Sequence, residues 1–242
     1  MNIKDKVILV TGAASGIGRS IVEKGLSLGA ILIACDINEE ELKRMQIDLS
    51  SDKLTIYKVD VSNYNEVKEF FKKIGNLKID CLVNNAGVYL AKSILDYSDN
   101  EFNKVIDINI KGAINFTKFY AESVMKEKRK GSIINISSVS GQEGSSDAIY
   151  SLTKAALLGF TKSCAMNFSP YIRVNAIAPG IVDTNMMKSI PNYRISEYRK
   201  SELIKEPILP EDVSNTVYFL ISDLSRNYSG STFDINNGCY LR

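Results

Sequence analysis

Tyr150 and Lys154 stand one helical turn apart in the segment AIYSLTKAAL, which spans residues 148–157. This spacing places both side chains on one face of a helix. The chain contains no histidine, so it lacks the side chain that most often transfers protons near neutral pH. An ammonium group about 4 Å from a phenol favours the phenolate by ~4 kcal/mol at an effective dielectric constant of about 20. Because that lowers the ordinary tyrosine pKa of about 10 toward neutrality, the pair predicts a tyrosine that acts as general base or acid.

The lack of histidine and the positions of the cysteines exclude several kinds of catalytic and metal site. Without histidine, Ser-His-Asp and Cys-His catalysis are excluded. The cysteines, Cys35, Cys81, Cys164 and Cys239, are scattered without a CxxC pair, and predict neither a zinc site nor a disulfide framework. Dispersed thiols are typical of a reducing compartment. We therefore expect a cytoplasmic protein that binds no metal.

Charge and hydropathy limit the partners. The net charge is only +2, from 30 basic and 28 acidic residues, which favours neither nucleic acid nor an anionic membrane as a partner. The first residues, MNIKDKVILVTG, lead into a predicted strand rather than a signal peptide. No stretch reaches the ~20 apolar residues of a membrane span. A small molecule is the expected partner.

Apolar runs alternate with amphipathic stretches along the whole chain. Buried strands are predicted at 6–10, 30–36, 54–60, 80–85, 132–137, 173–179 and 231–235, and helices at 16–29, 38–48, 63–74, 99–127 and 149–167. This alternation predicts one α/β domain over residues 1–242, a doubly wound, Rossmann-type parallel sheet of about seven strands with helices on both faces. The irregular stretch 183–210 follows the sixth strand, where a substrate lid is expected.

A glycine-rich turn, TGAASGIG, follows the first strand. Its glycines, Gly12, Gly16 and Gly18, permit a tight turn that brings backbone N–H groups to a pyrophosphate; the alternative is a plain strand–helix turn. Asp36 ends the second strand, where a carboxylate accepts from both ribose hydroxyls. Its alternative role is to cap the next helix, although Asn38 is also able to do so. The neutral neighbours Ser15 and Ile37 favour NAD over NADP.

The spacing of Tyr150 and Lys154 also occurs at Tyr64 and Lys68, with Ser51 upstream. Ser51 lies in a polar connection before a strand, whereas Ser137 and Ser138 end one, at the sheet edge where ligands bind. Tyr64 is therefore interpreted as a surface residue.

Taken together, TGAASGIG, NNAG at 84–87, SS at 137–138 and YSLTK at 150–154 resemble the short-chain dehydrogenase/reductase family over nearly the whole chain. The resemblance implies that Asn109, in IDINIKGA, relays protons through water, and that Ser138 polarises the substrate oxygen. Ser138 stands one position nearer Tyr150 than is usual in the family. Ser137 would restore the spacing, but strand alternation turns it to the other face. We therefore keep Ser138 and infer a one-residue deletion within QEGSSDA.

The resemblance also implies the rest of the cofactor site. Asn84 to Gly87 stabilise the central sheet beside the adenosine, Asp60 holds the adenine, and the APGIVDT segment contacts the nicotinamide side. The predicted cofactor-binding residues are Gly12, Ser15, Gly16, Ile17, Gly18, Asp36, Asp60, Val61, Asn85, Ala86, Gly87, Tyr150, Lys154, Pro179, Gly180, Val182 and Thr184. Local backbone capping is the alternative for Asn85 and Asn109, and capping of the lid helix is the alternative for Thr184.

The predicted function is an NAD-dependent oxidoreductase that interconverts a secondary alcohol and a ketone, with Asn109, Ser138, Tyr150 and Lys154 as catalytic residues. One alternative is an NADPH-linked 3-oxoacyl-(acyl-carrier-protein) reductase, against which Asp36 and the lack of a basic residue just before Tyr171 argue. Another is a dinucleotide-binding sensor without catalysis, which is expected to have lost part of the catalytic set.

The resemblance further implies a homotetramer, paired through the long helix after the fourth strand and the helix that carries the tyrosine. The segment KAALLGFTKSCAMNF, at 154–168, is apolar on more than one face. In the predicted lid, Tyr193, Arg194, Tyr198, Arg199 and Lys200 form either an anion site or a solvated helix face.

Overall fold

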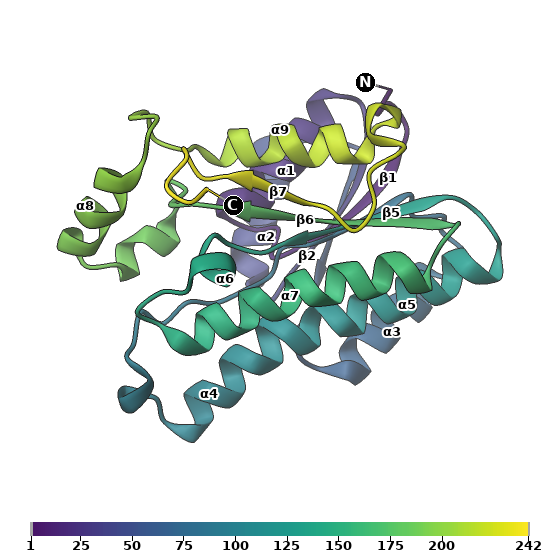
Figure 1. The fold of residues 1–242 in the computed structure, drawn as a ribbon. Coiled ribbons are helices and arrows are strands. Elements are labelled where there is room, and N and C mark those ends of the chain that lie inside the picture. Colours follow the sequence, from purple (N-terminus) through teal and green to yellow (C-terminus); the bar gives the residue numbers. More distant parts are fainter. Residues whose placement is uncertain (1, 242) are drawn as a thin grey trace.

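The computed structural model describes residues 2–241 and contains a parallel sheet between two layers of helices (Figure 1). Within these residues the sheet has seven strands in the order β3-β2-β1-β4-β5-β6-β7, every pair of neighbours parallel. The strands are β1 (Val7–Thr11), β2 (Ile31–Asp36), β3 (Leu54–Lys58), β4 (Cys81–Asn84), β5 (Gly131–Ile136), β6 (Ile172–Pro179) and β7 (Thr232–Ile235). The predicted doubly wound sheet is confirmed.

The strands are continuous apolar runs because helices cover both faces of the sheet. β1 is buried along its whole length, and its side chains alternate between two cores. Ile8 and Val10 belong to the core under α1 (Gly16–Ser27), α2 (Glu39–Leu49) and α9 (Pro210–Ile221). Val7 and Leu9 belong to the core under α3 (Tyr64–Ile74), α5 (Gly112–Lys126) and α7 (Ala148–Asn167).

β1 pairs with β2 on one side and with β4 on the other. At this point the chain reverses its direction of winding across the sheet. The crossovers therefore leave a crevice at the carboxyl ends of β1 and β4, which is where doubly wound folds bind ligands.

The predicted helix at 99–127 is interrupted. α4 (Asp99–Ile106) leads into a π-helical stretch, Asp107–Lys111, before α5 begins. A π-bulge inserts an extra residue into the turn and changes the direction in which a side chain points. Asn109 lies in this bulge and is 1% exposed, so the bulge directs a polar side chain into the protein.

Two further helices were not predicted. α6 (Ser140–Glu143) is a single turn after β5, and α9 follows the lid. The signal for α9 was Pro210 at its first position, which favours a helix start. No helix among residues 2–241 is long and apolar enough to cross a membrane.

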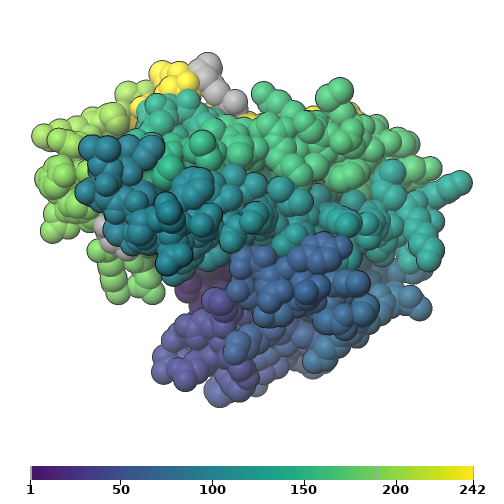
Figure 2. Space-filling model, turned by 90° about the horizontal axis from the view of Figure 1, so that it is seen from below, coloured from purple at the N-terminus to yellow at the C-terminus, as the bar shows by residue number. Residues whose placement is uncertain are grey.

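The predicted lid region contains a short 3-10 helix, Asn185–Ser189, and α8 (Asn192–Ser201). No residue of α8 is buried. In Figure 1 α8 projects from one end of the molecule, and the space-filling view in Figure 2 shows the same light-green segment at the edge of the body.

Candidate active site

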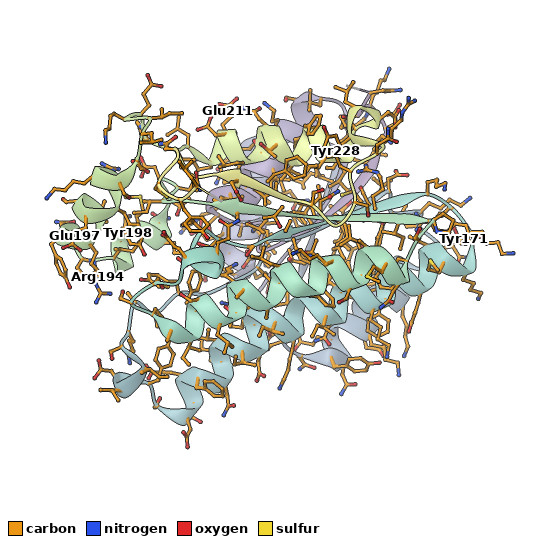
Figure 3. All side chains as sticks on the ribbon, in the orientation of Figure 1. Tyr171, Arg194, Glu197, Tyr198, Glu211 and Tyr228 are labelled. Atoms are coloured by element: carbon orange, nitrogen blue, oxygen red, sulfur yellow. The ribbon has the colours of Figure 1, made fainter. Side chains whose placement is uncertain are left out.

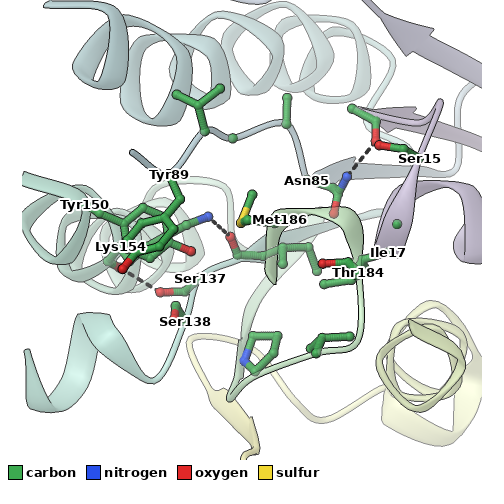
Figure 4. A pocket seen from close by; sticks show the side chains of 18 of the residues that line it. Ser15, Ile17, Asn85, Tyr89, Ser137, Ser138, Tyr150, Lys154, Thr184 and Met186 are labelled. Carbon is green, nitrogen blue, oxygen red and sulfur yellow. Dashed lines mark hydrogen bonds between the residues drawn. The ribbon is translucent and has the colours of Figure 1, made fainter. Parts of the chain in front are cut away.

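One cleft runs along the carboxyl edge of the sheet, from Asp36 to Tyr198. Its volume of about 380 Å³ falls within the usual range of roughly 300–1,000 Å³ for small-molecule sites. Every predicted site residue lines this cleft except Gly18 and Asn109. Figure 4 shows Ser15, Ile17 and Thr184 at one end and Tyr89, Tyr150 and Lys154 at the other.

The glycine turn packs too closely to accept side chains. Gly12 has φ +62°, and a Cβ there would lie 2.7 Å from the Ala86 Cα atom. A Cβ at Gly18 would lie 2.0 Å from the Gly12 carbonyl oxygen. Gly18 therefore packs against the turn and does not line the cleft, whereas its neighbours Gly16 and Ile17 do. The bare backbone at the start of α1 fits a pyrophosphate.

Asp36 is held by backbone donors on both sides. One carboxylate oxygen accepts from the Ala14 N–H at 3.0 Å and the other from the Asn38 N–H at 2.9 Å. Asn38, and not Asp36, caps α2, because its side chain accepts from the Glu41 N–H at 3.2 Å. Carboxylate oxygens have about four acceptor positions, so Asp36 keeps acceptors for two ribose hydroxyls. Its neighbour Ile37 is uncharged and 60% exposed.

Asn85 joins the end of β4 to the glycine turn. Its side-chain amide donates to the Thr11 and Gly12 carbonyls at 3.0 and 2.9 Å. The Thr11 hydroxyl in turn accepts from the Asn85 and Ala86 N–H groups, both at 3.1 Å. Asn85 thus lines the cleft and also donates hydrogen bonds to nearby backbone carbonyl groups, which is the local capping role given as its alternative. Asn84 lies deeper and donates to Thr117 and Asn135.

The segment predicted to contact the nicotinamide side follows β6. Pro179, Gly180, Val182 and Thr184 all line the cleft, and Val182 pairs with Ile208 in an isolated bridge. The Thr184 side chain makes no capping hydrogen bond, so the alternative role in capping is not observed.

Tyr150 lies in the first turn of α7, and Ser138 is close enough to lower the pKa of its phenol, against the larger rise that burial causes. The Ser137 hydroxyl instead donates to the Lys154 carbonyl oxygen at 2.7 Å, which leaves Ser138 as the serine on Tyr150. The Lys154 ammonium is buried and donates to the Ile136 carbonyl oxygen at 2.8 Å; it lies 5.6 Å from the centroid of the Tyr150 ring.

The pKa values of this pair differ from the sequence-based expectation. Burial raises the pKa of Tyr150, with smaller upward contributions from Tyr89, Asp147 and Tyr198, while Ser138 lowers it. Burial also lowers the pKa of Lys154 to about 8. The expected drop toward neutrality is absent because the ammonium bonds a carbonyl rather than the phenol, and because both groups lose water.

Asn109 uses its whole side chain within the protein. Its oxygen accepts from the Val88 N–H at 2.8 Å, and its amide donates to the Val88 carbonyl and the Thr153 hydroxyl at 3.0 and 3.1 Å. These bonds connect the segment after NNAG to α7. The water relay through Asn109 stays a prediction.

Sequence reasoning missed two residues beside Tyr150. The Tyr89 ring packs edge-on against the Tyr150 ring, with centroids 4.8 Å apart. Asp147 is fully buried and caps α7, accepting from the Tyr150 N–H at 2.9 Å. An N-cap residue just before a helical pattern was a readable signal for Asp147, whereas Tyr89 had none. Tyr64 stands apart from this group, at the first position of α3 and 43% exposed.

The substrate end of the cleft is mostly apolar, and much of its wall comes from the predicted lid region 183–210. Besides Tyr89 it comprises Val139, Met186, Met187, Ile190 and Tyr198. Among residues 2–241, no group of three His, Cys, Asp or Glu residues is placed to hold a metal ion.

Comparisons with known proteins agree with this geometry. The short chain dehydrogenase family matches residues 6–194. The chain is 34% identical to a 3-oxoacyl-(acyl-carrier-protein) reductase of Thermotoga maritima over 100% of both chains. It is 28% identical to a meso-2,3-butanediol dehydrogenase of Serratia marcescens, over 98% of this chain and 96% of that one. A Brucella melitensis 3-oxoacyl-(acyl-carrier-protein) reductase with bound NAD superposes with a TM-score of 0.90 at 32% identity, covering 100% of this chain and 93% of that one.

The cleft at the carboxyl edge of the sheet is thus lined by residues predicted to bind the cofactor and to catalyse the reaction. The relatives of the chain are oxidoreductases acting on CH–OH groups. The protein belongs to the short-chain dehydrogenase family, whose members are enzymes that bind a nicotinamide dinucleotide.

Proposed function

We propose that this enzyme is an NAD(H)-dependent oxidoreductase that interconverts a secondary alcohol and a ketone. The observation that carries the proposal is that the Tyr150 and Ser138 side chains line the same cleft as Asp36, with the buried Lys154 beside them. A substrate oxygen seated between the two hydroxyls gains a proton-transfer partner and a hydrogen-bond donor at once.

The preference for NAD rests on Asp36. Its carboxylate repels a 2′-phosphate, and its backbone partners Ala14 and Asn38 hold it in place. The neighbouring Ser15 and Ile37 line the cleft and carry no positive charge to bind that phosphate. The Brucella melitensis relative with bound NAD supports the same choice.

Nicotinamide, when bound, accepts a hydride during oxidation and returns it during reduction. In the oxidative direction Tyr150 takes the proton of the substrate hydroxyl group, and in the reductive direction it gives a proton back. Ser138 donates a hydrogen bond to the substrate oxygen, which gains negative charge as the proton leaves. Lys154, held by the Ile136 carbonyl, stabilises the phenolate and binds ribose. Asn109 holds the Val88 segment against α7. Its main-chain carbonyl oxygen accepts a hydrogen bond from the water molecule that relays protons.

A spectrophotometric screen tests the proposal. Secondary alcohols are offered with NAD⁺ and with NADP⁺, and the absorbance of reduced nicotinamide is followed. We expect turnover with NAD⁺ at a higher kcat/KM than with NADP⁺. An enzyme that turned over with NADP⁺ alone would overturn the cofactor assignment, and one that bound NAD⁺ without oxidising any alcohol would favour the sensor.

The second candidate is an NADPH-linked 3-oxoacyl-(acyl-carrier-protein) reductase. It is favoured by the full-length 34% identity to the Thermotoga maritima enzyme of that name. Asp36 opposes it, and Pro170 rather than a basic residue precedes Tyr171. Efficient reduction of a 3-oxoacyl thioester with NADPH, but not with NADH, would decide for this candidate.

We further propose a homotetramer in the cytoplasm. α7 leaves an open face at its small residues Ala155, Ala156 and Gly159, all exposed, and a Cβ at Gly159 would touch nothing. Leu152 and Met166, on the same helix, are 52% and 80% exposed. Such a face favours close packing of two helices. Light scattering at micromolar concentration is expected to give four times the chain mass; the mass of one chain, 26.9 kDa, would rule the assembly out.

A further inference from the structure

Three hydrogen-bonding side chains from distant segments meet at the rim of the substrate end, namely Tyr89, Ser146 and Arg194, here called the rim cluster. Arg194, on α8, donates from Nη1 to the Ser146 hydroxyl at 2.5 Å. Both groups lie close enough to the Tyr89 hydroxyl to lower its pKa, against the larger rise that burial causes. Figure 3 shows Arg194 and Tyr198 on the projecting helix of the lid.

The rim cluster lies one aromatic ring away from the reacting hydroxyl. Tyr89 lines the cleft, and its ring packs edge-on against Tyr150 (Figure 4). The hydroxyl end of that same ring reaches Arg194. A substrate whose alcohol carbon sits at Tyr150 therefore extends along Tyr89 toward the guanidinium group.

Arg194 has no ionic partner. Within residues 2–241 no carboxylate lies within 4.0 Å of its guanidinium, whereas Arg19 pairs with both Glu23 and Asp48. Its neighbours are the hydroxyl groups of Tyr89, Ser146 and Tyr193. A guanidinium offers five N–H donors, in a fork that fits a carboxylate, so donors remain for a ligand.

The acidic groups near the rim cluster do not pair with the Arg194 guanidinium. Asp147 is fully buried, and its oxygens accept from the Tyr97 hydroxyl and the Tyr150 N–H at 2.9 Å. Glu143 raises the pKa of Tyr198 and forms no ion pair with Arg194. Lys92 forms an ion pair with Glu101. Among residues 2–241, Arg194 thus has no ion pair and can bind an incoming anion.

We propose that the substrate is a hydroxy acid, or the matching oxo acid, whose carboxylate binds Arg194 with help from the Ser146 and Tyr89 hydroxyls. Because a tyrosine ring separates the guanidinium from the reacting hydroxyl, the carboxylate lies several carbons from the alcohol carbon. Val139, Met186 and Ile190 line the apolar stretch between. This inference rests on the proposed alcohol–ketone chemistry and adds the class of substrate.

A matched pair of substrates tests it. Wild-type enzyme is assayed with NAD⁺ and either 5-hydroxyhexanoate or its methyl ester, which differ in charge and little in shape. The acid is expected to give the higher kcat/KM. Arg194→Gln is expected to lower kcat/KM for the acid by ~10- to 100-fold, mainly through KM, as for the loss of a charged hydrogen-bond partner. The ester should change by less than about 2-fold, because it offers no charge.

Arg199→Gln is the control, since Arg199 is an exposed cation on the same helix and should change neither substrate. Equal losses for acid and ester in Arg194→Gln would mean that Arg194 only holds the lid, and would overturn the proposal. Equal kcat/KM for acid and ester in the wild type would overturn it too.

Binding without turnover separates this inference from the proposed function. Tyr150→Phe loaded with NADH is titrated with 5-oxohexanoate and with its methyl ester, and the nicotinamide fluorescence is followed. Tighter binding of the acid, lost when Arg194→Gln is added, supports the inference even if the wild type oxidises neither alcohol. No preference for the acid in this titration overturns the inference, even if alcohol oxidation is observed.

Discussion

The two ends of the cleft are built in different ways. At the dinucleotide end, nearby backbone groups hold the polar side chains of Asp36 and Asn85. Asp36 accepts from the Ala14 and Asn38 N–H groups, and Asn85 donates to the Thr11 and Gly12 carbonyl oxygens. At the substrate end, side chains meet side chains from remote segments, such as Tyr89 on Tyr150 and Arg194 on Ser146. The first end is fixed by the sheet, and the second by a helix without buried residues. A fold built in this way keeps the same cofactor site from protein to protein, while the side chains of the substrate site vary.

The largest expected effect separates chemistry from binding. Tyr150→Phe removes the proton donor and should lower kcat by ~10²–10⁴-fold, the usual size of general acid–base catalysis. The Kd for NADH, measured by fluorescence, should stay within about 2-fold, because phenylalanine keeps the ring and its packing on Tyr89. Tyr64→Phe is the control and should leave kcat unchanged, since Tyr64 contacts Lys118 at the surface. Normal turnover by Tyr150→Phe would contradict the assignment.

A smaller effect is expected from the dinucleotide end. Asp36→Ala removes the carboxylate that accepts the ribose hydroxyls and should weaken NADH binding by ~10- to 100-fold, as for the loss of charged hydrogen bonds. Affinity for NADPH should rise or stay unchanged, because the repulsion of a 2′-phosphate is gone. Titration of both cofactors by fluorescence measures the two values. If wild-type enzyme bound NADPH the more tightly, the role of Asp36 would be wrong.

The two ends of the cleft also differ in how well the sequence predicted them. The sheet and the glycine turn were predictable because short apolar runs, glycines and strand-end polar residues are local signals. Cleft residues at strand ends, such as Asp36 and Ser138, follow from the rule that ligands bind at the carboxyl edge. Tyr89 was not predicted, and Arg194 was named only as a lid residue of either an anion site or a solvated helix face. Their partners Tyr150 and Ser146 lie far away in the sequence. The π-bulge at Asn109 was missed for the same reason, since its stabilising partners Val88 and Thr153 are non-local.

A third prediction concerns pH, and rests on the groups that face Tyr150. These are Ser138, Tyr89, Tyr198 and the charged Asp147 and Lys154. Oxidation requires the phenolate, and burial together with Asp147 raises the pKa of Tyr150, so kcat/KM for oxidation should increase as the pH rises above neutrality. Asp147→Asn keeps an acceptor for the Tyr150 N–H but removes the negative charge, which favours the phenolate. The rise should therefore move to lower pH.

The pH–rate profile of kcat/KM, which reports groups of the free enzyme, distinguishes this from a purely structural role. If Asp147 only positioned α7, Asp147→Asn would lower kcat/KM equally at every pH. Tyr97→Phe is the matched control: it removes one donor to Asp147 and leaves the charge, so the profile should not move toward lower pH.

The smallest effect is expected from Asn38→Ala, which tests whether Asn38 and Asp36, near the start of α2, have separate roles. Asn38 caps that helix by accepting from the Glu41 N–H, while Asp36 faces the cleft. Asn38→Ala should lower the free energy of unfolding by about 1 kcal/mol, the typical loss of an N-cap. Its Kd for NADH should stay within about 2-fold, since the Asn38 N–H that bonds Asp36 belongs to the backbone and survives the substitution. Denaturant unfolding and fluorescence titration measure the two quantities. A loss of NADH affinity as large as that of Asp36→Ala would mean that the cap and the ribose site are one unit rather than two.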